Sequence, residues 1–129
     1  MSLSFLSIDK SIFVDLIKKD EQPGIEWGLK WFTVIPKSAN YFAVTRYREI
    51  VGVYYLNPYL SGFKLGVYIN HTKRSRGILK QLINFLTDED LYVEISHQNS
   101  VSLEVFKRLG FQTIHENSTS VKLKRSSSY

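Results

Sequence analysis

The chain of 129 residues is 43% apolar and 22% charged, which is the size and balance of one globular domain with its own hydrophobic core. It contains no cysteine, so disulfides, thiolate metal sites and cysteine nucleophiles are excluded. The formal net charge of +5 favours anionic partners such as phosphates, nucleic acid or acidic proteins, although the same surplus is compatible with a role in solubility alone.

The sequence shows no targeting signal. Residues 1–9 have no basic residue ahead of their short apolar stretch, and serines interrupt that stretch, which argues against a signal peptide. No apolar run approaches the roughly 20 residues that span a bilayer. We therefore expect a soluble, cytoplasmic protein without membrane contact, in which residues 1–125 form a single domain and residues 126–129 a flexible tail.

The first half of the chain predicts one helix followed by three strands. Residues 10–19 carry apolar side chains at helical spacing, and Asp9 precedes them as an N-cap. Pro23 and Gly24 then break the chain, and residues 25–37 fit neither class of element. Alternating β-branched and aromatic residues separated by short turns predict three antiparallel strands, over residues 40–47, 49–56 and 63–69.

The second half predicts two helices and three further strands. The strongest helix is expected over residues 76–87, and a second one over residues 100–109 ends at Gly110. The buried stripes of the two helices are predicted to be Leu79, Leu82, Ile83 and Leu86, and Val101, Val105, Phe106 and Leu109. Strands are expected over residues 91–96, 111–115 and 120–124.

This order of elements predicts an α/β fold with a mixed, mostly antiparallel sheet of about six to seven strands flanked by helices. The unit over residues 63–96 is a strand, a helix and a strand, so we expect a right-handed parallel crossover. A ligand site is expected where the crossover helix begins, because the first turn of a helix presents unpaired backbone N–H groups and a positive dipole end.

The sequence around that helix start suits a phosphate group. Residues 73–80 read Lys-Arg-Ser-Arg-Gly-Ile-Leu-Lys, so positive charge surrounds a glycine that permits close approach of a ligand to the backbone. A solvated basic loop with a helix-capping glycine is the alternative interpretation of the same residues.

The stretch from Leu65 to Leu86 resembles the coenzyme-binding motif of the GNAT superfamily of N-acetyltransferases. That motif has Gln or Arg, two residues, Gly, one residue, then Gly or Ala, and Arg74, Gly77 and Leu79 stand at these positions. Leu79 departs from the small residue of the family pattern. Residues 93–99 followed by Leu109-Gly110-Phe111 are similar to the second family motif, and the two motifs occur in the family order.

The resemblance implies an acyl-CoA-dependent N-acyltransferase with acetyl-CoA as co-substrate. The acyl-CoA would lie in a V-shaped gap where the strands over residues 63–70 and 91–96 diverge. The coenzyme-binding residues implied are Ile69, Lys73, Arg74, Ser75, Arg76, Gly77, Ile78, Leu79, Lys80, Asn99 and Phe106. Capping of the following helix is the alternative role of Asn99.

The resemblance also implies a tyrosine acid three residues before Leu-Gly-Phe, and this chain has Phe106 there, which cannot donate a proton. Tyr68, Glu94 and Ser96 are the catalytic candidates in its place, with His71 as a further substitute. Glu94 is a candidate base if burial raises its pKa. The alternative interpretations are an exposed strand residue for Glu94 and a polar loop residue for His71.

The sequence leaves the acceptor amine open among proteins, nucleic-acid-associated molecules and small molecules. The positive net charge favours an acidic or nucleic-acid-associated acceptor over a cationic small molecule. Candidate walls of the acceptor pocket are Trp27, Trp31, Tyr41, Tyr54 and Tyr55, which are equally expected in a core. Competing hypotheses are a catalytically silent GNAT-like domain that binds CoA or a protein partner, and a basic nucleic-acid-binding domain. No metal site is expected, and a homodimer is a further expectation.

Overall fold

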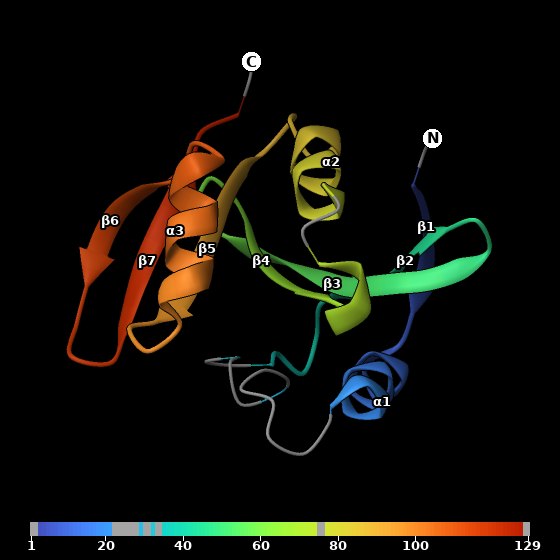
Figure 1. The fold of residues 1–129 in the computed structure, drawn as a ribbon. Coiled ribbons are helices and arrows are strands. Elements are labelled where there is room, and N and C mark those ends of the chain that lie inside the picture. The colour runs from blue at the N-terminus through green and yellow to red at the C-terminus, as the bar shows by residue number, and fades with distance from the viewer. Residues whose placement is uncertain (1–2, 22–28, 30–31, 33–34, 75–76, 128–129) are drawn as a thin grey trace.

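The computed structural model describes residues 3–21, 29, 32, 35–74 and 77–127, which form one open sheet with three α-helices (Figure 1). The strands are β1 (Ser4–Ile8), β2 (Asn40–Arg46), β3 (Glu49–Tyr59), β4 (Gly62–Ile69), β5 (Asp90–Ser96), β6 (Gln112–Glu116) and β7 (Ser120–Arg125). The helices are α1 (Lys10–Asp20), α2 (Ile78–Phe85), α3 (Ser100–Arg108) and the short 3₁₀ helix η2 (His71–Lys73).

The seven strands follow the order β1-β2-β3-β4-β5-β7-β6 across the sheet. All neighbours pair antiparallel except β4 and β5, which are parallel and are joined through α2. The predicted mixed, mostly antiparallel sheet of six to seven strands is therefore confirmed. Within the described residues, no helix combines the length and the apolar character needed to cross a bilayer.

Two strands differ from the sequence-based expectation. Strand β1 is not among the predicted strands, because its serines break the alternating pattern and its side chains are at most half-buried at the sheet edge. Strand β3 continues through Pro58 to Tyr59, three residues beyond its predicted end. Strand β2 pairs with β3 only as far as Leu56. Pro58 has no backbone N–H, and it is tolerated because β3 has no neighbouring strand on the β2 side at this position.

The helices cover opposite faces of the sheet, with α1 on one side and α2 and α3 on the other (Figure 1). Phe13 and Ile17 of α1 pack against Tyr41, Val53 and Tyr55 in one buried cluster. Leu82 and Ile83 of α2 and Phe106 of α3 belong to a second, larger cluster with strand residues that include Tyr54, Leu65 and Val93. We call these two sides the α1 face and the α2/α3 face.

Local signals place most helix ends correctly. Asp9 caps α1 by accepting a hydrogen bond from the Ile12 N–H at 2.9 Å, and Gly110 follows α3 with φ of 95°. The predicted burial of Val101 is wrong, because its side chain is 73% exposed. It stands in the first turn of α3 and lines an open cleft instead of the core.

Candidate functional site

The parallel strands β4 and β5 hold together only at one end. Their register covers three residue pairs, Gly62–Asp90, Phe63–Leu91 and Lys64–Tyr92, after which the strands diverge. A cleft of about 980 Å³ opens beyond the last pair. The predicted gap between these two strands is therefore present.

The cleft passes through the sheet from one face to the other. Every residue from Lys64 to Ile69 lines it, and successive residues of a strand point to opposite faces. Leu65 and Phe106 line it on the α2/α3 face, whereas Tyr55 and Tyr68 line it on the α1 face. A ligand entering from one side can thus meet a second ligand entering from the other.

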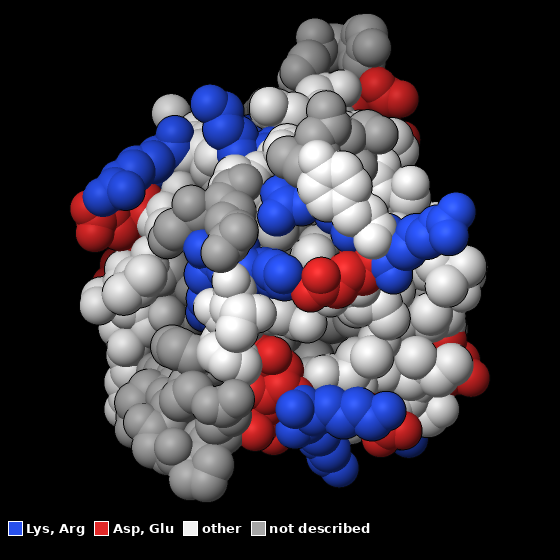
Figure 2. Space-filling model, turned by 45° about the vertical axis from the view of Figure 1, so that its right-hand side comes forward, with Lys and Arg blue, Asp and Glu red and all other residues white. Residues whose placement is uncertain are grey.

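The mouth of the cleft on the α2/α3 face carries the glycine and the positive charge that suit a phosphate. Gly77 precedes α2 with φ of 75°, and a Cβ atom there would meet nothing within 4 Å. Lys73, Arg74, Lys80 and Arg108 also line the cleft. Lys and Arg side chains gather near the middle of one face of the molecule, with acidic side chains beside them (Figure 2).

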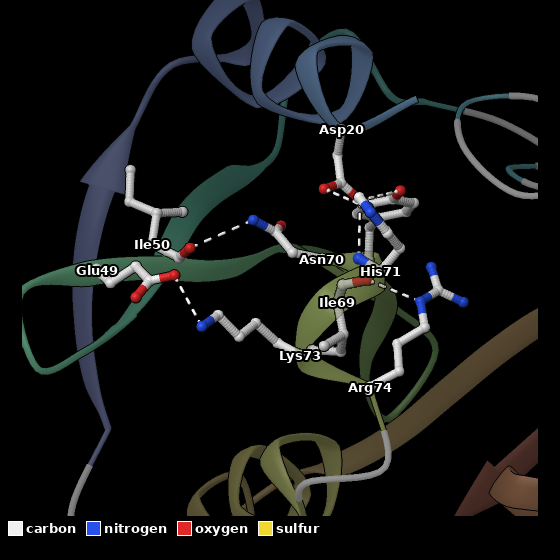
Figure 3. A network of polar contacts seen from close by, with 9 residues as sticks. Asp20, Glu49, Ile50, Ile69, Asn70, His71, Lys73 and Arg74 are labelled. Atoms are coloured by element: carbon white, nitrogen blue, oxygen red, sulfur yellow. Dashed lines mark hydrogen bonds and ion pairs between the residues drawn. The ribbon is translucent and has the colours of Figure 1, made fainter. Parts of the chain in front are cut away.

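The end of α1 is tied to the segment that leads into this mouth (Figure 3). The Asp20 carboxylate accepts hydrogen bonds from the Tyr68 hydroxyl at 2.6 Å and from the His71 backbone N–H at 2.8 Å. The Nδ1 atom of His71 lies 2.9 Å from the other carboxylate oxygen. Three contacts thus converge on one side chain that is 11% exposed.

Contacts to β3 and β4 hold the same segment from the other side (Figure 3). The Lys73 ammonium pairs with Glu49 at 2.8 Å, and the Asn70 amide donates to the Ile50 carbonyl at 3.3 Å. The Arg74 Nε–H donates to the Ile69 carbonyl at 3.0 Å. Although the Glu49 side chain is 60% exposed, it takes part in this network.

The Tyr68 hydroxyl donates its hydrogen bond to the Asp20 carboxylate. Burial, and then the hydrogen bond to the Asp20 carboxylate, raise the pKa of Tyr68 well above its ordinary value. The Arg74 guanidinium lies 5.1 Å from the centre of the Tyr68 ring. Tyr68 therefore forms part of the wall of the cleft while its hydroxyl joins β4 to α1.

Glu94 lies on the α1 face and is held by two donors. The Lys64 ammonium is 2.6 Å from one carboxylate oxygen, and the Ser120 hydroxyl donates to the other at 2.8 Å. Burial alone would raise the pKa of Glu94, but these hydrogen bonds and the nearby Lys64 and Lys122 charges outweigh it and lower the pKa below its ordinary value. The condition for a base at this position, a pKa raised by burial, is thus not met.

Known proteins resemble this architecture in structure only. No family model and no curated protein matches the sequence. An acetyltransferase from Thermus thermophilus matches with a TM-score of 0.74 at 16% identity, over 98% of this chain and 97% of that one. The N-acetyltransferase PseH from Campylobacter jejuni matches with a TM-score of 0.70 at 16% identity, over 98% and 99%. An acetyltransferase of the GNAT family from Streptococcus pneumoniae matches with a TM-score of 0.64 at 8% identity, over 98% and 100%.

The chain has the GNAT N-acetyltransferase fold.

The GNAT fold places most residues of the predicted coenzyme set along the cleft. Those that line it are Ile69, Lys73, Arg74, Gly77, Ile78, Leu79, Lys80, Asn99 and Phe106. Ser75 and Arg76 lie outside the described residues. The Asn99 side chain accepts from the Ser102 N–H at 3.3 Å, so its helix-capping role is present in a residue that also borders the cleft.

The two departures from the GNAT motifs are both accommodated by packing. Phe106 is 5% exposed, and its ring lies edge-on to Phe111 with centroids 5.1 Å apart. Leu79 is half-buried and packs against the larger cluster. A phenylalanine and a leucine at these positions therefore fill apolar wall where the family pattern has a hydroxyl and a small side chain.

The remaining candidates divide between the cleft and its surroundings. Tyr68 and Glu94 line the cleft, whereas the Ser96 hydroxyl accepts from the Gln98 N–H at 3.2 Å and is not among the described lining residues. Of the expected acceptor walls, Tyr55 lines the cleft, and Tyr41 and Tyr54 are core residues. Trp27 and Trp31 lie outside the described residues.

Sequence reasoning missed Asp20 and Lys64, the partners of Tyr68 and Glu94. Asp20 ends an amphipathic helix, a position that gives no sign of a contact 48 residues away. Lys64 shares a strand face with Gly66 and Tyr68, and that alternation is the one signal that places its side chain on the same side as theirs.

Proposed function

We propose that the protein is an acetyl-CoA-dependent N-acetyltransferase. The observation that carries the proposal is a cleft that crosses the sheet between parallel strands and has a glycine-started helix and basic side chains at its mouth. Structural neighbours with this fold include PseH in complex with acetyl coenzyme A and a spermidine N-acetyltransferase chimera. Both neighbours are named as N-acetyltransferases, and the proposed reaction is likewise the transfer of an acetyl group to an amine.

The residues at the mouth fit the anionic end of the coenzyme. A phosphate group needs space beside the first N–H groups of α2, and Gly77 leaves that space because a Cβ there would contact nothing. Lys73, Arg74 and Lys80 supply positive charge around it. The contacts of Asp20 and Glu49 hold His71 and Lys73 in place without a ligand, so these two residues would need little ordering on binding.

The coenzyme supplies a thioester whose carbonyl carbon is open to attack by a neutral amine. A bond forms between the amine nitrogen and that carbon, the carbon–sulfur bond breaks, and its electron pair remains on sulfur. The amine proton passes to water or to the departing sulfur, which gives an amide and free CoA. The thiol pKa of about 8.5 makes the thiolate a competent leaving group without a tyrosine acid.

The chain's own groups set the surroundings of this reaction. Phe106 keeps the coenzyme side of the cleft apolar, and Tyr68 directs its hydroxyl at Asp20. Glu94 is the carboxylate that lines the cleft among the described residues, and its lowered pKa makes it a weak base. Its role as a catalytic residue remains a prediction.

Replacement of Gly77 tests the coenzyme site. Gly77→Asp places a negative charge beside the proposed phosphate position, and we expect the acetyl-CoA dissociation constant measured by calorimetry to rise at least about tenfold. Gly77→Asn is the matched control, because Asn and Asp tolerate positive φ similarly and differ in charge. An Asp near a helix N-terminus also interacts favourably with the helix dipole, so lost binding would not reflect a weakened α2.

Equal acetyl-CoA affinities of the Gly77→Asp and Gly77→Asn variants would contradict the placement of the coenzyme phosphates at this site.

A second candidate function is a GNAT-fold protein that binds CoA without acetyl transfer, and the phenylalanine at position 106 favours it. Thiol release from acetyl-CoA in the presence of amines separates the two functions. Binding without thiol release for any amine would establish the silent binder.

A further inference from the structure

The α1 face of the cleft holds a cluster of charged and aromatic side chains beside the point where β4 and β5 diverge. Lys64 and Glu94 line the cleft there, with side chains 18% and 16% exposed. Lys122 is the register partner of Glu94 on the neighbouring strand β7. The ammonium groups of both lysines lie near Tyr59, at 5.6 and 5.7 Å from its ring centre. We call Tyr59, Lys64, Glu94, Ser120 and Lys122 the floor cluster.

Glu94 and Asp20, two carboxylates of this face, already accept hydrogen bonds from the chain itself. Both oxygens of Glu94 accept hydrogen bonds, one from Lys64 and one from Ser120. Asp20, the last residue of α1, lies near the other end of β4, and both of its carboxylate oxygens are in contact with Tyr68 or His71. A cationic ligand would therefore meet carboxylates whose oxygens already accept hydrogen bonds from the chain itself.

The floor cluster has a net positive charge. Lys64 and Lys122 together carry two charges and Glu94 carries one of the opposite sign. Lys122 donates to the Tyr59 hydroxyl, a neutral group, at 3.2 Å. Since the charges are half-buried, water screens them less than it screens charges on an open surface.

A positive floor also suits the chemistry of an acceptor amine. The nitrogen must lose a proton before it attacks, and a nearby positive charge disfavours the ammonium form. An anionic group on the same molecule would bind this floor while its amine extends into the cleft. A polyamine would bring further positive charge to the same place.

We infer that the acceptor is a small amine that carries a carboxylate or a phosphate group a few bonds from its nitrogen, and that Lys122 and Lys64 recognise this anion. The inference rests on the proposed acetyl transfer and names the acceptor class for the same cleft. The floor cluster supports it, because its two lysines, Lys64 and Lys122, stand beside a single carboxylate, that of Glu94.

Amines matched in length and different in charge test the inference. Thiol release from acetyl-CoA is measured with β-alanine, propylamine and diaminopropane, which end in a carboxylate, a methyl group and an ammonium group. Ethanolamine and phosphoethanolamine form a second pair, and the two series distinguish a carboxylate from a phosphate as the preferred anion. We expect kcat/KM to be highest for an anionic member and lowest for diaminopropane.

Lys122→Gln should lower kcat/KM for the preferred anionic amine by roughly three- to tenfold and lower the value for propylamine by a smaller factor. Lys107→Gln, an exposed change of the same charge on α3, is the matched control and should alter neither value. Acetyl-CoA affinity measured by calorimetry should be the same in all three proteins, because Lys122 pairs with Glu94 at the α1 face, whereas the proposed coenzyme phosphates bind at the α2/α3 face.

The inference is overturned if diaminopropane is the best acceptor, if the matched amines are used equally, or if Lys122→Gln affects all amines alike. If acetyl-CoA binds and no amine releases thiol, calorimetric affinities of the CoA-bound protein for the same amines decide the order instead. Absence of acetyl-CoA binding would instead overturn the proposed function, so the two failures are distinguishable.

Discussion

Glu94 lines the cleft and at the same time connects neighbouring strands of the sheet. Its carboxylate joins β5 to β4 through Lys64 and to β7 through Ser120, whose side chain is buried. The folded protein holds the charged form of Glu94 more favourably than the unfolded chain does, since the pKa is lowered. Glu94 therefore contributes to stability whenever it is ionised.

Glu94→Gln should lower the free energy of unfolding by about 1–3 kcal/mol at neutral pH, because two hydrogen bonds to a charged acceptor are weakened. The stabilisation is fully present above the ordinary pKa of 4.5 and is lost as the pH falls through the lower pKa of the folded state. Urea unfolding should thus show a difference between the two proteins that narrows as the pH falls below 4.5.

Glu104→Gln is the control for this effect. Glu104 pairs with Arg108 one turn along α3, but both side chains are well exposed, so the change should stay within about 0.5 kcal/mol. A Glu94→Gln protein as stable as the unmodified one at neutral pH would show that the carboxylate is not stabilised by its neighbours.

Among the elements, α1 and η2 have the connection that bears most directly on function. The last residue of α1, Asp20, contacts β4 and the first residue of η2, and η2 leads into the helix start at Gly77. Because the segment is held from α1 and from β3, the position of the proposed phosphate site depends on elements far from it in sequence.

Asp20→Ala should raise the acetyl-CoA dissociation constant about three- to tenfold, because binding must then order the segment that η2 begins. Asp20→Asn should fall between, since an amide oxygen can still accept the two hydrogen bonds, from the Tyr68 hydroxyl and the His71 N–H, that share one carboxylate oxygen. Calorimetry measures the affinity, and Asp15→Ala, an exposed change on the same helix, is the control. Unchanged affinity in the Asp20→Ala protein would contradict a positioning role.

On the scale of the whole molecule, the sheet consists of two antiparallel parts joined by a short parallel ladder. Strands β1 to β4 form one part and β5, β7 and β6 the other, and three residue pairs connect them. The short ladder is what leaves the cleft open. A Cβ atom at Gly62 would lie 2.0 Å from the Asp90 carbonyl oxygen, so the ladder depends on a glycine at this position.

Gly62→Ala should therefore lower the free energy of unfolding by about 1–3 kcal/mol, as an added methyl group forces the two backbones apart. Denaturant unfolding measures the effect, and Ser126→Ala, an exposed change beyond β7, should be neutral. If Gly62→Ala were equally neutral, the close approach of β4 and β5 at this end would not be required for the fold.

The sequence by itself determined the features that depend on neighbouring residues. The Asp9 cap, the positive φ of Gly110, the burial of Leu82 and Ile83 in α2 and the glycine at the start of α2 follow from propensities and spacing within one or two turns. Leu79 and Leu86 of the predicted stripe are only partly buried, and Ile78, which was not predicted, is buried. The strand–helix–strand unit and the two GNAT motifs were sufficient to predict the fold.

Only the tertiary structure decided which polar groups meet. Asp20 contacts residues 48 and 51 positions away, and Glu94 contacts residues 30 and 26 positions away. The exposure of Val101 and the length of β3 were likewise set by the cleft and by the end of β2. Strand register and the divergence of β4 from β5 fix these contacts, and register depends on the packing of the whole sheet, which local sequence patterns do not encode.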